Sequence, residues 1–208
     1  MIHQRPSQLT LPLHMPRDPV SHITPPLGKP ALADVLGKDF SNLAHFPAIT
    51  PAEASRHAPQ IGLAGESLVT SWAARRGLAP VSMPAGAPFD HIFTVGPHLV
   101  RAQTKTTTGP RRDGRYSFNM SRGNSGDPNG TSAYASNAFD LAALVFLDLG
   151  VIYFTTEKKS RFRFTTEEAQ LMAHIEFECF CDCLLQLAVI DRRAFDILTN
   201  EPDCEANC

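Results

Sequence analysis

The sequence has no uninterrupted apolar run near the roughly 20 residues that a membrane-spanning helix requires. Its first thirty residues also lack the charged start and apolar stretch of a signal peptide. Cysteine is scarce as well: there are five, an odd number, all between positions 179 and 208. They cannot form a disulfide framework that spans the chain, so we expect reduced thiols. These absences favour a cytoplasmic protein with no membrane partner.

Neither sign of charge dominates the chain as a whole, whose formal net charge is −2. The charges are nevertheless segregated along it. The middle of the chain is basic, whereas residues 165–208 carry ten acidic and only two basic side chains. A basic middle suits a surface that binds nucleic acid, and the acidic end suits a solvated or partner-facing region.

Proline separates the beginning of the chain from the rest, because seven of the 17 prolines lie within the first thirty residues. No sustained periodicity accompanies them, so we expect an irregular arm over residues 1–60, with short helices near 31–37 and 51–57. A core of mixed pattern follows over 61–164. A helical, acidic extension is expected over 165–208.

Within the core the pattern changes from helical to alternating. Apolar spacing predicts a helix over 62–76, which Gly77 ends, and then strands over 78–83, 89–95, 98–106 and 116–120. A polar, Gly-rich loop over 121–133 and a short helix over 137–141 precede two strands, 142–148 and 151–157, joined at Gly150. Thr165 and Glu168 have the spacing of a capping box that starts the helical region. The chain is therefore predicted to be α/β, with a central mixed sheet flanked by helices.

One polar constellation falls on two adjacent predicted strands. Asp90 begins one of them, and Gln103 and Lys105 lie two residues apart on the next, so their side chains share a face of the sheet. Hydrolysis of a phosphodiester needs a hard cation held by oxygen ligands and a positive group near the attacking water. Asp90 and the Gln103 amide oxygen can supply the ligands, and Lys105 the positive group. Glu66, early in the preceding helix, can add a second carboxylate.

The order of these motifs resembles that of the PD-(D/E)XK nuclease superfamily. The resemblance rests on G-x-x-G-E at Gly62–Glu66, F-D-x-I at Phe89–Ile92, V-R-A-Q-T-K-T at Val100–Thr106, Y-x-F at Tyr116–Phe118, then Tyr134, Phe139-Asp140 and V-I-Y-F at Val151–Phe154. It covers residues 62–164. The sequence looks closest to the branch with cyanobacterial group I intron homing endonucleases and archaeal Holliday-junction-resolvase-like enzymes.

The resemblance implies a restriction-endonuclease-like core and a catalytic site. Glu66, Asp90 and Gln103 would surround Mg²⁺, for which Mn²⁺ can substitute, and Lys105 would assist the nucleophile. The sequence departs from the usual pattern in two places: Pro88 stands two residues before Asp90, and Gln103 replaces a carboxylate, as in the Q-x-K variant of the homing endonucleases. The activity implied is a Mg²⁺-dependent DNA endonuclease. The alternative is a catalytically inactive nuclease-fold protein that binds DNA or serves assembly.

Further residues are candidates for contact with the DNA backbone, because their basic or hydroxyl side chains flank the proposed site in the sequence. They are Arg101, Thr107, Arg111, Arg112, Arg115 and Arg122. Asp140 is expected to support the core rather than the chemistry, and Tyr134 to carry a structural hydroxyl. Cutting both strands of a duplex favours a homodimer or a higher oligomer.

The cysteines offer a separate candidate site. Cys179, Cys181 and Cys183 form C-x-C-x-C, with Cys204 and Cys208 further on. Their apolar neighbours favour buried thiols, with zinc as the alternative.

Overall fold

The structure is a computed structural model that describes residues 43, 45–84, 86–123 and 130–200. The predicted helix near 31–37, part of the predicted loop at 121–133, Cys204 and Cys208 lie outside these residues. Two helices open the described part, α2 (Pro51–Arg56) and α3 (Ala58–Arg75). Thr50 caps α2 by accepting a hydrogen bond from the backbone N–H of Glu53. Gly77, at φ +73°, follows α3 in the left-handed conformation typical of a helix end.

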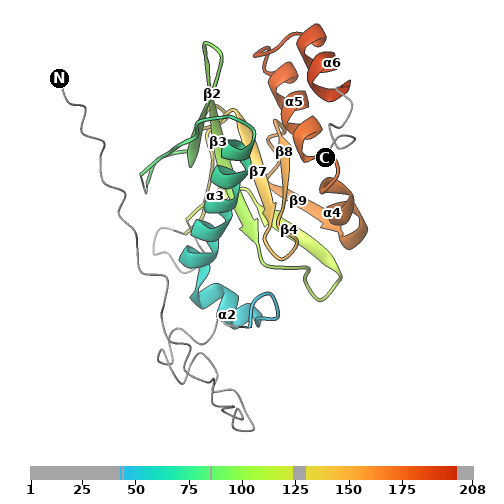
Figure 1. The fold of residues 1–208 in the computed structure, drawn as a ribbon. Coiled ribbons are helices and arrows are strands. Elements are labelled where there is room, and N and C mark those ends of the chain that lie inside the picture. The colour runs from blue at the N-terminus through green and yellow to red at the C-terminus, as the bar shows by residue number, and fades with distance from the viewer. Residues whose placement is uncertain (1–42, 44, 85, 124–129, 201–208) are drawn as a thin grey trace, which may run out of the picture. The chain divides into compact units, whose positions relative to one another are not determined.

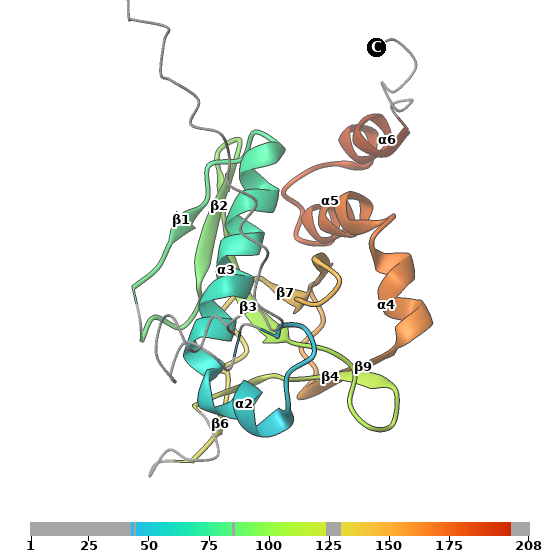
Figure 2. The same cartoon turned by 60° about the horizontal axis from the view of Figure 1, so that its bottom comes forward.

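The central sheet has five strands in the order β1-β2-β3-β7-β8. Figure 1 labels β2, β3, β7 and β8, and Figure 2 labels β1. They are β1 (Val81–Ser82), β2 (His91–Val95), β3 (His98–Thr107), β7 (Leu141–Phe146) and β8 (Val151–Thr155). The pairs are antiparallel except for β3 with β7, which is parallel. The predicted mixed sheet flanked by helices is confirmed.

A second layer of strands covers one face of this sheet. Strand β4 (Arg115–Asn119) pairs with β9 (Arg161–Thr165), and α4 (Thr166–Met172) follows β9 directly (Figure 2). Two short strands, β5 (Ser121–Arg122) and β6 (Ser132–Ala133), pair with each other. The chain then ends its described part in α5 (Glu176–Gln186) and α6 (Arg192–Asn200).

Strand β7 lies at the middle of the core, and all six of its residues are buried. Because side chains alternate along a strand, Leu141, Ala143 and Val145 pack toward α3 and α5, whereas Ala142, Leu144 and Phe146 pack toward β4, β9 and α4. A strand that is covered on both faces has a continuous run of apolar residues in its sequence. The apolar run at this position is what predicted a strand.

Helix α5 completes the first of these two clusters. Trp72 of α3 packs against Phe154 of β8 and Phe180 of α5, at ring-centroid distances of 4.5 and 5.1 Å. Cys183 and Leu184 of α5 belong to the same buried cluster. The helical C-terminal region therefore shares its core with the sheet.

Three expectations about secondary structure are wrong. The predicted loop over 121–133 carries the paired strands β5 and β6 at its two ends. Residues 137–141 form a turn and not a helix, because Leu141 already begins β7 and the Asp140 backbone N–H donates to Arg101 of β3. Residues 161–165, for which no element is predicted, form β9. The alternation of Arg161, Phe162, Arg163 and Phe164 is typical of a strand with one buried face. Within the described residues, no helix is both long and apolar enough to cross a bilayer.

Candidate active site

Strand β3 extends beyond the end of its neighbour β2. The candidate site lies beside the part of β3 that β2 does not pair with. Strand β2 pairs only with residues 98–102 of β3, whereas β7 pairs with residues 102–107. The next residue before β2 is Asp90, whose backbone N–H donates to the Ala102 carbonyl. Its carboxylate accepts the Thr104 backbone N–H at 2.7 Å, and so takes the place of a neighbouring strand at that point.

Gln103 and Lys105 share the face of β3 that the sequence predicted. Their partners in β7 are Ala142 and Leu144, which belong to the cluster beneath β4 and β9. The Gln103 amide nitrogen donates to Asp90 Oδ2 at 2.5 Å and to the Thr104 carbonyl at 3.1 Å. A carboxylate and an amide from adjacent positions of the sheet thus meet directly.

Glu66 reaches the same place from α3. An open cleft of about 500 Å³ is lined by Glu66, Asp90, Gln103 and Lys105 together. The close approach of α3 depends on Gly65: a Cβ at that position would lie 1.9 Å from Thr106 Oγ1 on β3. The absence of a side chain at Gly65 therefore brings Glu66 to the strand that carries the other three groups.

Lys105 is held from two sides. Its ammonium donates to the Ser121 carbonyl at 2.8 Å and lies 5.0 Å from the centre of the Tyr134 ring. A lysine ammonium has three N–H donors, so the bond to Ser121 leaves two for a water or a phosphate. The Ser121 contact was not predicted, because any residue can offer a carbonyl and the sequence gives no sign of it.

The charges of the site influence one another. Burial raises the pKa of Asp90, which the Thr104 N–H, the Lys105 ammonium and the Gln103 amide oppose. Burial also raises the pKa of Glu66, and the negative charge of Asp90 adds to that effect. Burial lowers the pKa of Lys105, against the attraction of Asp90. Two partly desolvated carboxylates beside one lysine are an arrangement that a bound cation would stabilise.

The donor set fits a hard divalent cation. Glu66 and Asp90 offer carboxylate oxygens, and a half-turn of the Gln103 amide would exchange its nitrogen for its oxygen, the usual ligand type for Mg²⁺. Within the described residues there is no group of three or more His, Cys, Asp or Glu side chains placed to hold a metal. A cation at this site would therefore have the two carboxylates and the Gln103 amide oxygen as its protein ligands, with water in the remaining positions.

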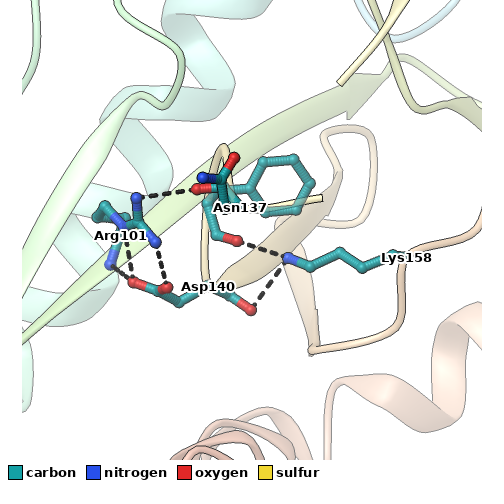
Figure 3. A network of polar contacts seen from close by, with 5 residues as sticks. Arg101, Asn137, Asp140 and Lys158 are labelled. Carbon is teal, nitrogen blue, oxygen red and sulfur yellow. Dashed lines mark hydrogen bonds and ion pairs between the residues drawn. The ribbon is translucent and has the colours of Figure 1, made fainter. Parts of the chain in front are cut away.

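Arg101 occupies a different environment from the other predicted DNA contacts (Figure 3). Its guanidinium forms a two-pronged ion pair with Asp140, Nε to Oδ2 at 3.0 Å and Nη2 to Oδ1 at 2.7 Å, and Nη1 donates to the Asn137 carbonyl. Lys158 donates to the carbonyls of Phe139 and Asp140. Although burial opposes it, Arg101 holds the pKa of Asp140 below its ordinary value. The network fixes the segment before β7 to β3, as expected of Asp140.

The other predicted contacts are spread around the site. Thr107 and Arg111 line the cleft itself, and Arg112 lines an adjoining one. Arg115 is exposed at the start of β4. Arg122 Nη2 lies 3.4 Å from the Gly86 carbonyl. Tyr134 packs edge-on against Phe139 at 5.2 Å and, through Lys105, borders the site.

The three described cysteines lie along α5 as free thiols, with Cys181 and Cys183 buried and Cys179 half-buried. Burial, reinforced by neighbouring carboxylates, raises the pKa of Cys179 to about 11 and that of Cys183 to about 12. For Cys181, burial raises the pKa to about 11. The expected buried thiols are confirmed for Cys181 and Cys183.

These thiols are therefore expected to resist modification. In a Cys204→Ser/Cys208→Ser chain at pH 8, a pKa of about 11 leaves about one Cys179 thiol in a thousand as the reactive thiolate. We expect Ellman's reagent to modify Cys179 slowly, and Cys181 and Cys183 only after unfolding. Three thiols should react in guanidinium chloride. Prompt reaction of all three in the native protein would contradict the burial of α5.

Comparisons with known proteins add two solved structures. No protein-family model and no curated protein matches the chain. The bacterial homing endonuclease I-Ssp6803I aligns with a TM-score of 0.46 and 19% identity, over 51% of this chain and 77% of its own. A Holliday junction resolvase from the archaeal hyperthermophile Archaeoglobus fulgidus aligns with a TM-score of 0.34 and 13% identity, over 53% and 88%. Both alignments are at low sequence identity.

Proposed function

We propose that this protein is a metal-dependent DNA endonuclease. The observation that carries the proposal is the convergence of Glu66, Asp90, Gln103 and Lys105 on one open cleft. Glu66 comes from α3, Asp90 from the residue that precedes β2, and Gln103 and Lys105 from β3. Burial and mutual charge shift the pKa of the three titratable groups among them. Perturbed ionisable groups gathered in a cleft are typical of sites that carry out chemistry.

The four residues have two kinds of role in this proposal. Glu66, Asp90 and the side-chain amide oxygen of Gln103 would hold Mg²⁺ or Mn²⁺, which supplies charge stabilisation and a more acidic bound water. Lys105, anchored by Ser121, orients the attacking water and places positive charge beside the phosphate as its negative charge increases. Asp90 also keeps β3 in place through Thr104.

The surroundings agree with a DNA substrate. Thr107 and Arg111 on the cleft lining suit contact with phosphates, which supply affinity rather than sequence recognition. One site addresses one phosphodiester, so double-strand cleavage calls for two copies of the chain. We place the enzyme in the cytoplasm, where buried thiols such as Cys181 stay reduced.

A nuclease-fold protein that binds DNA without cutting it is the second candidate. It is favoured by the Gln103 amide, whose N–H donates to Asp90 and to the Thr104 carbonyl, because this network satisfies its own hydrogen bonds without a cation. The two candidates differ in what metal does to the substrate and not in whether DNA binds.

Metal dependence tests the proposal most directly. Wild-type protein is expected to cut supercoiled plasmid or a synthetic four-way junction in Mg²⁺ or Mn²⁺ and to be inactive in EDTA, because the two carboxylates need a cation to bring a phosphate close. Gel electrophoresis of the products provides the measurement, and salt-dependent DNA binding in EDTA is the control. Binding without cleavage in either metal would support the second candidate.

A further inference from the structure

A second, larger cleft adjoins the candidate active site. Its volume is about 1180 Å³. Four residues line both clefts, namely Ala54, Thr107, Thr108 and Arg111. The two clefts therefore meet, and a substrate strand that reaches Asp90 and Lys105 can continue into the second one.

The two walls of this second cleft differ in chemistry. One wall comes from the segment entering α2 and from α2 itself, and is mainly apolar: Pro47, Ala48, Ile49, Pro51 and Ala54. The other comes from the turn between β3 and β4 and carries Thr107, Thr108, Arg111 and Arg112. That turn is held by the Arg111 N–H, which donates to the Arg115 carbonyl at 2.9 Å, and by Gly114 at φ +71°.

Two acidic residues, Asp113 and Asp148, also line the second cleft. Asp113 Oδ1 accepts the Arg115 backbone N–H at 3.2 Å, and Asp148 Oδ2 accepts the Tyr116 hydroxyl at 2.8 Å, whereas Asp148 Oδ1 is buried without a hydrogen-bond partner among the described residues. Among the residues that the structure describes, neither Arg111 nor Arg112 takes part in an ion pair. Their guanidinium groups remain available to an anionic ligand.

We propose that the second cleft binds an unpaired DNA strand next to the site of cleavage. A duplex presents phosphates on both of its outer sides and keeps its base faces inside, so it would place charge against the apolar wall. A single strand instead presents phosphates to one side and base faces to the other. The guanidinium groups of Arg111 and Arg112 then face the phosphates, and the apolar wall around Ile49 faces the bases. This inference rests on the proposed function and names its substrate as DNA with a single-stranded extension or branch.

The test compares a blunt duplex with the same duplex carrying a single-stranded extension. Binding is measured in EDTA by fluorescence anisotropy at several salt concentrations, and cleavage in Mg²⁺. Wild-type protein is expected to bind the extended DNA several-fold more tightly. Ile49→Asp, which puts a negative charge on the apolar wall, should lower affinity for the extended DNA more than for the blunt duplex and so remove that preference.

Arg112→Ala gives an independent measure on the exposed turn. It should weaken binding of the extended DNA and reduce the slope of log affinity against log salt by about 0.7, the change for one phosphate contact on a single strand. Ile49→Val and Arg193→Ala, the latter on the exposed surface of α6, are the matched controls and should behave as wild type.

The outcomes separate this inference from the proposed function. Equal wild-type affinity for the two DNAs, or an equal loss on both in the Ile49→Asp and Arg112→Ala variants, would overturn the single-strand cleft. Cleavage without a preference leaves the nuclease standing and removes this inference. A preference for the extended DNA without cleavage removes the nuclease and leaves the second cleft as a binding site for single-stranded DNA.

Discussion

Cleavage by a Lys105→Met variant is expected to be slower than wild-type cleavage by about 10²–10³-fold, the usual cost of losing one group that stabilises developing charge. Methionine keeps most of the length and apolar bulk of the lysine but removes the ammonium that Ser121 and Tyr134 hold in place. Single-turnover cleavage in Mg²⁺ measures the chemical step. DNA affinity in EDTA should fall only as expected for the loss of one cationic side chain.

Two comparisons make this result specific. Arg193→Met removes a positive charge from α6, on an exposed position outside both clefts, and should leave the rate unchanged. Asp90→Asn keeps an oxygen that can accept the Thr104 N–H but removes the carboxylate, so it should abolish Mg²⁺-dependent cutting while the protein stays folded. A wild-type rate in the Lys105→Met variant would exclude Lys105 from the chemistry.

Gly65→Ala is expected to lower the free energy of unfolding by about 1–3 kcal/mol, the usual cost of overpacking a core. The added Cβ would lie 1.9 Å from Thr106 Oγ1, so α3 must move away from β3. Glu66 is the next residue of α3 and would move with it. We therefore expect cleavage to decrease even under conditions in which the variant is fully folded. Urea unfolding provides the stability, and plasmid cleavage the activity.

The same helix supplies an internal control of opposite sign. A Cβ at Gly62 would meet nothing within 4 Å, so Gly62→Ala should stabilise the protein by up to about 1 kcal/mol through its higher helix propensity. Adding Thr106→Ala to Gly65→Ala removes the clashing Oγ1 and should restore part of the lost stability. Equal effects of the two alanine substitutions would show that α3 does not depend on this close contact.

Much of the fold could be predicted because its strongest signals are local. The strand predicted over 142–148 and found over 141–146, the turn at Gly150 and the capping box of Thr165 and Glu168 each depend on a few adjacent residues. The pairing of β4 with β9 could not be predicted in this way, because their partners are more than forty residues apart in the chain. Such pairing depends on which surfaces fit once the sheet has formed.

In the candidate site, too, only the features that depend on neighbouring residues could be predicted from the sequence. That Gln103 and Lys105 share a face followed from alternation, but the position of Glu66 came only from the family resemblance. Its nearness to the others depends on Gly65 fitting against Thr106, which no local pattern encodes. Arg101 shows the opposite case. As a basic side chain beside the site it was predicted to contact DNA, and the structure pairs it with Asp140, 39 positions later. Its contact with DNA stays a prediction.

The place of α5 in the core has a consequence for how the chain folds during synthesis. Phe180, Cys183 and Leu184 cover Trp72 and Phe93, which belong to the helix and sheet that carry the candidate site. On the ribosome these residues emerge long after Lys105, so the nascent chain holds the groups of the site before it can bury the core beneath them. Because contacts between such distant segments form slowly, we expect the site to reach its final geometry only after α5 has been synthesised. A nuclease of the kind proposed would then stay inactive until α5 has packed against α3 and the sheet.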